Sequence, residues 1–309
     1  MPTLTVFTPA YNRAHTLGRT YESLLAQTNK DFVWSIIDDG SKDNTKDTVE
    51  DWIKKTTEFE IRYFYKENGG LHTAYNLAIE KADTELSVCI DSDDYMPDNA
   101  VELILNCWKI NGCDKYAGIT GLDFNAKNGE VVGGRYPDNL ETINLADVAF
   151  GKYPKSMGDK KHVVRTQLYK QVAPMKVFEG EKNFNPHYMH MLISRDYDFL
   201  VLNENLCFVD YQEDGMTGNM YWQYYNSPNS FAEIRRLRLS FDSIPFKYMI
   251  RQCIHYDSSC ILAKQKNIVK NCPKKFWALM CMPFGFVLSR LILYKNRKRE
   301  NEKGFIFDS

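Results

Sequence analysis

The first hundred residues alternate between short apolar runs and segments with helical spacing. The apolar runs predict strands at residues 4–7, 32–37, 61–65 and 86–90. Apolar positions three or four apart predict helices at 17–27, 45–55, 71–82 and 97–109, with Thr45 as an N-cap. The run 32–37 is apolar nearly throughout, as expected of a strand buried on both faces. Strand–helix alternation predicts a parallel sheet with right-handed crossovers and helices on both faces.

Beyond residue 116 this rhythm changes. Residues 116–124 and 130–132 flank Asn128-Gly129, which predicts a β-hairpin. Residues 138–215 mix loops and short helices, one of them expected at 188–195, and the chain from 216 onward is rich first in aromatic and then in basic and apolar residues. The prediction is an α/β domain over 1–215 followed by a helical extension over 216–309.

Composition and charge exclude several classes of protein. With 309 residues, 44% apolar and 26% charged, the chain can bury a large core, so wholesale disorder is excluded. A net charge of −1 argues against a nucleic-acid partner, which needs a basic face. The charge is uneven, because eleven Lys/Arg against three Asp/Glu from Lys264 onward give +8 and leave −9 on the preceding residues.

Cysteine usage and the N-terminal sequence predict a cytoplasmic protein. None of the eight cysteines forms a CxxC pair, and several lie inside apolar runs. A strand pattern follows Met1-Pro2, without the basic segment that opens a signal peptide. We therefore expect reduced thiols.

Unusual polar residues follow three of the predicted strands. They are Thr8–Arg13 after the first strand, Asp38-Asp39 after the second and Asp91–Asp94 after the fourth. In an open parallel sheet, ligands bind in the crevice outside the carboxyl ends of the strands. The sequence therefore predicts one site that combines hydroxyl, aromatic, amide and carboxylate groups.

Asp91-x-Asp93 is the sharpest feature of this set. Two carboxylates two residues apart at a strand end point the same way, and a divalent cation relieves their repulsion. Mg²⁺ or Mn²⁺ held by one or two carboxylates and completed by substrate phosphates suits such a pair. The alternative is an acidic cluster that solvates a turn or caps the next helix. The position directly after an apolar strand favours the metal interpretation.

The absence of several motifs argues against assigning the chain to other enzyme classes. No GxGxxG follows the first strand and no GxxxxGK[ST] occurs, so dinucleotide and P-loop binding lose their main support. The sequence also lacks the GxSxG of serine hydrolases and the HExxH of zinc hydrolases.

Four motifs together resemble those of family-2 glycosyltransferases with the GT-A fold. They are Thr8-Pro-Ala-Tyr11-Asn-Arg13, Asp38-Asp-Gly-Ser-x-Asp43, Asn68-Gly-Gly and Asp91-Ser-Asp-Asp94, in family-like order and spacing. Weaker resemblance to bacterial polysaccharide-assembly members continues through residues 211–217. The resemblance implies a mostly parallel, Rossmann-like sheet flanked by helices, with a nucleotide-sugar half over about 1–115 and an acceptor half over about 116–215.

The resemblance also implies a sugar-nucleotide donor, expected to be a UDP-sugar, a Mn²⁺ or Mg²⁺ ion, and inversion at the anomeric carbon. Asp39 would accept a hydrogen bond from a uracil-like N–H, with Asp38 supporting it or orienting the loop. Asp91 and Asp93 would hold the ribose–diphosphate and the metal, with Asp93 as the direct ligand. The further implied donor contacts are Thr8, Pro9, Tyr11 and Ser92, and at a second tier Arg13, Asn68 and His72. Arg13 is equally well explained as an ordinary surface residue.

An inverting transfer needs a base that takes the proton of the acceptor hydroxyl. In the family an acidic residue before a helix has this role, but Pro186-His187 stands here where Pro-Glu is expected. Glu181 and His187 are the candidates, with Glu179 as a further alternative. The competing interpretation is that these residues only cap the helix at 188–195.

The C-terminal extension offers two readings. Its aromatic residues between 211 and 231 suit stacking on sugar rings or a membrane interface, although packing between helices is the commoner use of such residues. In the same stretch, Asp214 and Thr217 are candidate contacts to the acceptor. Residues 276–289 carry no charge and 295–299 are basic, whereas Pro283 and Arg290 interrupt the apolar run and argue against a membrane span. We expect peripheral membrane contact through 276–299, on the inner face of the plasma membrane, or a buried helix packed on the domain.

The function predicted is transfer of a hexose-type sugar from a nucleotide-diphosphate donor to a saccharide or polyprenyl-linked saccharide of the cell surface. One alternative is a sugar-1-phosphate nucleotidyltransferase, which would require a glycine-rich basic loop where Thr8–Arg13 stands. The other is a non-catalytic sugar-nucleotide-binding protein or membrane-docked scaffold of a polysaccharide assembly system.

Overall fold

The chain forms two compact units. The computed structural model describes the backbone of residues 2–210 and 220–307, and side chains as far as residue 298. The first unit comprises Met1–Met175 and Met189–Tyr211, and the second comprises Lys176–Tyr188 and Gln212–Ser309. The segment 176–188 therefore packs with the C-terminal helices, although it interrupts the first unit in sequence.

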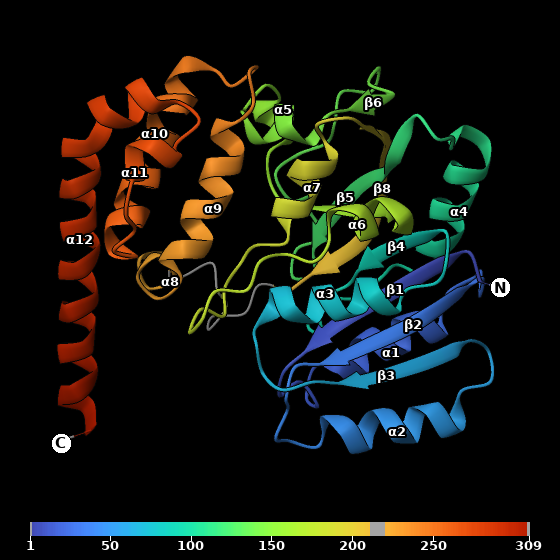
Figure 1. Cartoon of the computed structure of the whole chain (residues 1–309). Helices are drawn as coiled ribbons and strands as arrows, with labels where there is room; N and C mark the ends of the chain where they lie inside the picture. Colours follow the sequence, from blue (N-terminus) through green and yellow to red (C-terminus); the bar gives the residue numbers. More distant parts are fainter. Residues whose placement is uncertain (1, 211–219, 308–309) are drawn as a thin grey trace. The chain divides into compact units, whose positions relative to one another are not determined.

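The first unit is built on an eight-stranded sheet (Figure 1). Its strands, in chain order, are β1 (Leu4–Ala10), β2 (Phe32–Asp38), β3 (Glu60–Tyr65), β4 (Leu86–Cys89), β5 (Tyr116–Asn125), β6 (Thr142–Ile143), β7 (Lys160–Arg165) and β8 (Asp198–Val209). Their order across the sheet is β3-β2-β1-β4-β7-β5-β8-β6. The predicted α/β class with a mostly parallel sheet is confirmed.

Strand direction places the carboxyl ends of six strands at one edge. The pairs β1–β2, β2–β3, β1–β4 and β5–β8 are parallel, whereas β7 runs antiparallel to both β4 and β5. Because β7 reverses direction between them, β4 and β5 point the same way. The start of β7 therefore lies at the edge where β1, β2, β3, β4, β5 and β8 end.

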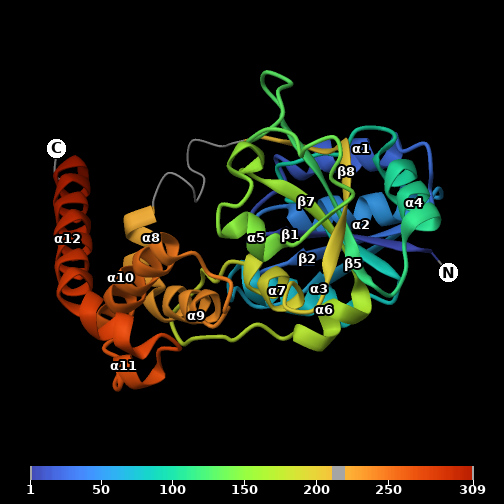
Figure 2. The ribbon, with the colours of Figure 1, turned by 90° about the horizontal axis from the view of Figure 1, so that it is seen from above.

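Helices cover both faces of this sheet. They are α1 (Leu17–Leu25), α2 (Thr45–Lys55), α3 (Leu71–Lys81), α4 (Ala100–Asn111), α5 (Leu145–Ala149), α6 (Thr166–Val172) and α7 (His187–Ile193), with a 3₁₀ turn at Pro154–Ser156. Figure 2 shows α3, α6 and α7 on one side of the sheet and α1 and α4 on the other. Helix α7 crosses the division between the two units.

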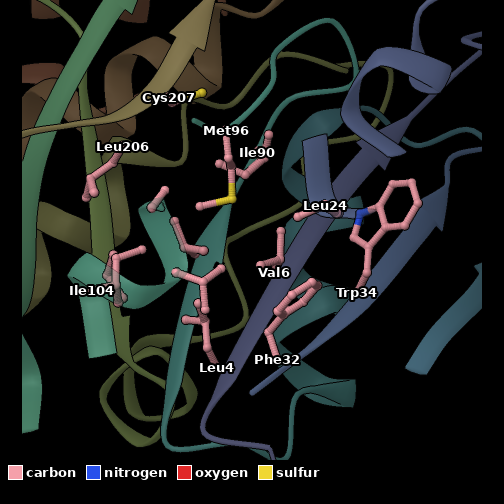
Figure 3. Close-up of a cluster of buried hydrophobic side chains, with 14 of the residues drawn as sticks. Leu4, Val6, Leu24, Phe32, Trp34, Ile90, Met96, Ile104, Leu206 and Cys207 are labelled. Carbon is pink, nitrogen blue, oxygen red and sulfur yellow. The ribbon is translucent and has the colours of Figure 1, made fainter. Parts of the chain in front are cut away.

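The apolar residues of β1 are buried on both faces of the sheet. Leu4 and Val6 are fully buried in a cluster with Leu24 of α1 (Figure 3). Phe7 points the other way and packs edge-on against Tyr75 of α3, with ring centroids 5.0 Å apart. Apolar side chains of β1 thus have apolar neighbours on both faces, while the hydroxyls of Thr5 and Thr8 are hydrogen-bonded.

Three local expectations differ from the structure. Thr45 is the first residue of α2 and not its N-cap, which is Asn44, because the Thr45 hydroxyl donates instead to Asp43. The expected strand at 130–132 is reduced to a single bridge between Phe124 and Val131. Helix α4 begins at Ala100, because the backbone N–H of Ala100 bonds to the carbonyl of Pro97 in a preceding turn.

The second unit is helical, as the extension beyond residue 216 was expected to be. It contains α8 (Met220–Asn226), α9 (Pro228–Leu239), α10 (Phe246–Leu262), α11 (Ile268–Asn271) and α12 (Lys275–Phe307). Helix α12 packs against α10 and passes through Pro283 as one element, so Pro283 does not break it. Within the described part of the chain, residues 275–298 form one helix long and apolar enough, by length and composition, to cross a membrane.

Candidate active site

The loops that follow β1 and β2 are bonded to each other at the carboxyl edge of the sheet. Asn12 donates its backbone N–H to the hydroxyl of Ser41 at 2.8 Å and accepts the N–H of Lys42 on Oδ1 at 2.8 Å. Asp43 accepts the backbone N–H of Ala14 at 3.1 Å. These bonds hold the Thr8–Arg13 motif against the Asp38–Asp43 motif, which is the proximity that the strand-end argument predicted.

Side chains of the first motif differ in exposure. Tyr11 is 45% exposed at the edge of the sheet, whereas Thr8 and Pro9 are buried. The Thr8 hydroxyl accepts the indole N–H of Trp34 at 3.0 Å. Tyr11 is therefore accessible to a ligand, while the hydroxyl of Thr8 is committed to the core.

Asp39 is buried and bonded to the loop after β3. Its Oδ1 accepts from the Lys66 ammonium at 2.5 Å and the Gly69 N–H at 3.0 Å. Its Oδ2 accepts from the Asn68 amide at 3.2 Å and the Gly70 N–H at 2.8 Å. A carboxylate has about four lone-pair positions, so the chain itself occupies all of them.

The glycine turn at Asn68-Gly69-Gly70 is required by this arrangement. Gly70 has φ +92°, a conformation that residues other than glycine rarely adopt. At Gly40, with φ +86°, a Cβ atom would lie 2.7 Å from the backbone nitrogen of Asn68. Gly40 thus allows the two segments to meet backbone to backbone, and Gly70 turns its N–H toward the Asp39 carboxylate.

Asp38 orients the loop that follows it. It is buried, and it accepts the Ser41 N–H at 2.7 Å and the Tyr63 hydroxyl at 2.6 Å. Burial and the Asp38 carboxylate raise the pKa of Tyr63 well above its ordinary value, so the phenol remains a donor.

Asp91–Asp94 forms a turn directly after β4. The backbone N–H of Asp94 bonds to the carbonyl of Asp91 at 3.0 Å. Asp91 is exposed and Asp93 is half-buried, whereas Ser92 and Asp94 are buried. Burial and the charge of Asp91 raise the pKa of Asp93, while Arg13 and Arg19 oppose the rise. Arg13 thus acts electrostatically on the acidic turn.

Arg19 of α1 ties the acidic turn to the end of β8. Its guanidinium donates to the carbonyl of Asp93 at 2.5 Å and to the carboxylate of Asp210 at 3.0 Å. The backbone N–H of Asp210 in turn donates to Asp94 at 3.1 Å. The end of β8 is therefore a further strand terminus of the site.

A buried lysine lies beneath the turn. Lys161, at the start of β7, has its Nζ 3.8 Å from Asp94 and 3.8 Å from Asp123 of β5. Burial raises the pKa of Asp94 to about 7 and that of Asp123 to about 6, and the Lys161 charge opposes both increases. For Lys161, burial lowers the pKa and Asp123 raises it, with a net result above the ordinary value. Lys161 therefore stays charged between two carboxyl groups.

Sequence reasoning missed Arg19, Asp123, Lys161 and Asp210. Asp210 carries the same signal as the recognised motifs, because it directly follows an apolar strand. Nothing local marks Lys161, since its partners come from β4 and β5 and meet it only through the antiparallel insertion of β7.

The residues present fit a divalent ion that is shared with a phosphate ligand. Within residues 2–210 and 220–298, no group of three His, Cys, Asp or Glu side chains forms a cation site. The Asp91 carboxylate raises the pKa of Asp93, so an added cation would relieve their repulsion. Carboxylates that supply one or two ligands, with phosphate oxygens and waters completing the shell, are the usual Mg²⁺ arrangement.

The two candidate bases lie in the second unit. Glu181 is buried, and its carboxylate accepts four hydrogen bonds of 2.7–2.9 Å from the backbone and side chains of Asn229 and Ser230. These donors form the first turn of α9, so Glu181 acts as the anion at that helix N-terminus. His187 is half-buried, and its backbone N–H donates to Asn185 at 2.8 Å. Glu179 is exposed.

Two further predicted residues require comment. His72, in the first turn of α3, is buried. The acceptor contacts expected of Asp214 and Thr217 lie outside the described residues.

The sequence profile of glycosyl transferase family 2 matches residues 5–160, just over half of the chain. This chain belongs to glycosyltransferase family 2. The matched region contains all four strand-end motifs, so the predicted resemblance is confirmed.

The chain is also similar to individual glycosyltransferases. TarP of Staphylococcus aureus, a poly(ribitol-phosphate) beta-N-acetylglucosaminyltransferase, is 26% identical over 237 residues, which are 73% of this chain and 71% of TarP. Chondroitin synthase of Pasteurella multocida is 36% identical over 105 residues, which are 34% of this chain. Those residues are only 11% of the synthase, so this glycosyltransferase matches a small part of that relative.

Solved structures confirm the GT-A fold. TarS 1–349 of Staphylococcus aureus superposes with a TM-score of 0.58 at 16% identity, covering 96% of this chain and 91% of TarS. TarS has also been solved with UDP and with UDP-GlcNAc. The mannosyltransferase PcManGT of Pyrobaculum calidifontis, in complex with GDP-Man and Mn²⁺, gives a TM-score of 0.55 at 17% identity over 96% of this chain and 82% of PcManGT.

Proposed function

We propose that this family-2 glycosyltransferase moves a hexose-type sugar from a UDP-sugar to a saccharide or polyprenyl-linked saccharide of the cell surface, with inversion and with a divalent metal ion. The observation that carries the proposal is the acidic turn Asp91–Asp94 at the same sheet edge as the Asp39 loop and Tyr11. The UDP and UDP-GlcNAc complexes of TarS and the acetylglucosaminyl transfer named for TarP support this donor class.

The donor would occupy the edge formed by β1, β2 and β4. Tyr11, exposed at the end of β1, is available to stack on the base, and the Asp39 loop lies beside it. Asp39 has all its acceptor positions filled, so a base N–H must replace one donor. Lys66 is the donor most readily displaced, because its amine is tethered by a flexible side chain while the Gly69 and Gly70 donors are backbone.

Asp93, with Asp91, would bind the metal together with the donor diphosphate. When bound, Mn²⁺ or Mg²⁺ neutralises the charge that develops on the leaving diphosphate. Arg19 and Lys161 hold the turn in place: Arg19 binds its backbone, and Lys161 offsets the charge of the neighbouring carboxyl groups.

In the transfer step the acceptor hydroxyl oxygen forms a bond to the anomeric carbon, and the bond to the nucleoside diphosphate breaks. The hydroxyl proton passes to a base, and we propose His187 for this role in preference to Glu181. Glu181 is the poorer candidate, because four hydrogen bonds commit its carboxylate to the first turn of α9. An imidazole ordinarily titrates near neutral pH and so suits proton transfer.

The four hydrogen bonds that hold Glu181 at α9 also favour a second candidate function, because they leave His187 as the remaining candidate base. If His187 does not act as a base either, the chain is a non-catalytic sugar-nucleotide-binding protein of a polysaccharide assembly system. Turnover with any UDP-sugar excludes this alternative, whereas donor binding without turnover supports it.

Calorimetry tests the proposed function. We expect UDP to bind in Mn²⁺ and to lose affinity in EDTA, and Asp93→Asn to lose the difference between these conditions. Asp98→Asn is the matched control, because Asp98 is an exposed carboxylate just beyond the same turn. Failure of every uridine and guanosine nucleotide to bind, or Mn²⁺-dependent binding retained by Asp93→Asn, would contradict the assignment.

A further inference from the structure

Helix α12 has two stripes on opposite sides. The stripe that faces α10 is buried and consists of Ala278, Cys281, Gly285, Ser289, Ile292 and Asn296. Gly285 permits the closest approach, since a Cβ atom there would lie 2.5 Å from the Cβ of Asp257 on α10. These positions recur every three or four residues, as expected of one helix face.

The opposite stripe is exposed and apolar. Its members are Phe276, Met280, Phe284, Val287, Leu291 and Tyr294, with exposed fractions from 41% for Leu291 to 66% for Val287. At 1.5 Å per residue the stripe is about 27 Å long. Large contiguous apolar surfaces of this kind mark interaction sites, because a soluble protein rarely leaves them uncovered.

The sequence that carries this stripe is basic, and the first acidic residues after it are Glu300 and Glu302. Residues 258–299 contain ten Lys/Arg and no Asp or Glu. Lys275 precedes the stripe and Lys295 follows it, and the Arg290 guanidinium lies over the Phe286 ring at 4.7 Å. An apolar face bordered by basic side chains is complementary to an anionic lipid surface.

Aromatic residues lie at the basic end of the stripe. Tyr221 of α8 has its ring centroid 4.0 Å from the Nζ of Lys295, and its carbonyl accepts from the Asn296 amide at 3.0 Å. Trp222 and Tyr225 on the same helix are 51% and 40% exposed. Tyr and Trp side chains concentrate at the boundary between lipid and water, since one end is apolar and the other polar.

We propose that the exposed stripe of α12 binds an anionic membrane surface, with the helix lying in the plane of the interface. The proposal does not depend on the donor site, which belongs to the other unit. Its length and composition would also allow α12 to span a bilayer. Spanning would separate α12 from α10 and uncover Asp257 and the rest of the buried stripe, whereas an in-plane helix keeps them packed. A second copy of the chain fits the exposed stripe less well, because the basic side chains of the two copies would repel each other.

Vesicle flotation of the full chain tests this surface. We expect flotation with phosphatidylcholine vesicles that contain about one quarter phosphatidylglycerol, and none with phosphatidylcholine alone. Lys295→Gln and Arg290→Gln should each weaken binding about fivefold, and Phe284→Glu more than tenfold. The matched controls are Lys109→Gln and Ile110→Glu on α4, which change an exposed lysine and a 78%-exposed isoleucine in the other unit.

Four outcomes would overturn the proposal. The first is equal binding to neutral and anionic vesicles, and the second is unchanged binding of Phe284→Glu. The third is bound protein that alkaline buffer does not extract from the vesicles. The fourth is a protein that does not float but self-associates, with the self-association abolished by Val287→Glu. Extraction resistance would show a spanning helix, and self-association would show a second copy as the occupant. UDP binding measured on the same samples reports separately on the donor site.

Discussion

Lys161 and Asp94 meet beneath the acidic turn, with the lysine Nζ 3.8 Å from the Asp94 carboxylate. Both side chains are buried, and the Asp123 carboxylate is also 3.8 Å from the same amine. One cation is thus shared between two carboxyl groups that would otherwise be buried without compensation. The turn that carries Asp91 and Asp93 rests directly on this group.

Lys161→Met should reduce the free energy of unfolding by about 3 kcal/mol, since removing one partner of a buried ionic group leaves the other uncompensated. It should also weaken Mn²⁺-dependent UDP binding. Urea denaturation and calorimetry measure the two effects. Lys160→Met is the control, because that neighbouring side chain donates to the carbonyl of Val132, forms no ion pair with Asp94 or Asp123, and acts on Asp123 only through its charge. Equal effects of both variants would contradict a specific role for Lys161.

Lys66→Ala should leave UDP affinity unchanged or tighter, because it frees one acceptor position on Asp39. Asp39→Asn should weaken UDP binding at least tenfold and destabilise the fold by about 2 kcal/mol, since an amide group cannot accept all of the present donors. Titration calorimetry and urea denaturation are the measurements. A large loss of affinity in Lys66→Ala would instead show that the lysine contacts the donor.

Glu181→Gln should destabilise the second unit by about 2 kcal/mol, because it removes the anion at the N-terminus of α9. Sugar transfer per folded molecule should persist in this variant. His187→Ala should lower the turnover number at least a hundredfold while UDP affinity stays unchanged, because the acceptor proton then has no base. Loss of turnover in Glu181→Gln with the fold intact would reverse the two assignments.

Asp257 predicts a pH dependence of stability. It is fully buried on α10, and neither oxygen has a hydrogen-bond partner among the described residues. Burial, with a smaller contribution from Cys272, raises the pKa of Asp257 to about 8. The native state therefore holds a proton that the unfolded state has released, so the free energy of unfolding should fall between about pH 4 and pH 8. The slope should approach 1.4 kcal/mol per pH unit.

Asp257→Asn should remove this slope, because an amide does not titrate. Urea denaturation of the wild type and the variant at several pH values measures it. The control is Asp242→Asn, a fully exposed aspartate near the start of α10. Parallel pH profiles for wild type and Asp257→Asn would rule out the buried carboxyl as the cause.

The first half of the fold was predictable because its signals are local. Continuous apolar runs such as 32–37 predict strands buried on both faces. The segments between them have helical spacing, and alternating strands and helices predict a parallel sheet. The acidic and glycine motifs stand at strand ends in sequence, and parallel strands bring those ends to one edge. Asp39 and Asp91–Asp94 were found in this way.

What the sequence by itself determined is the parallel strands β1 to β4, the family, and the acidic turn with its flanking motifs. The tertiary structure alone decided that β7 enters antiparallel between β4 and β5 and carries Lys161 beneath the turn. It also decided that Glu181 is bonded to α9 and that α12 buries one stripe while exposing the other. These features depend on which distant segments pack together, and a buried charge or an uncovered apolar face becomes recognisable only when its neighbours are in place.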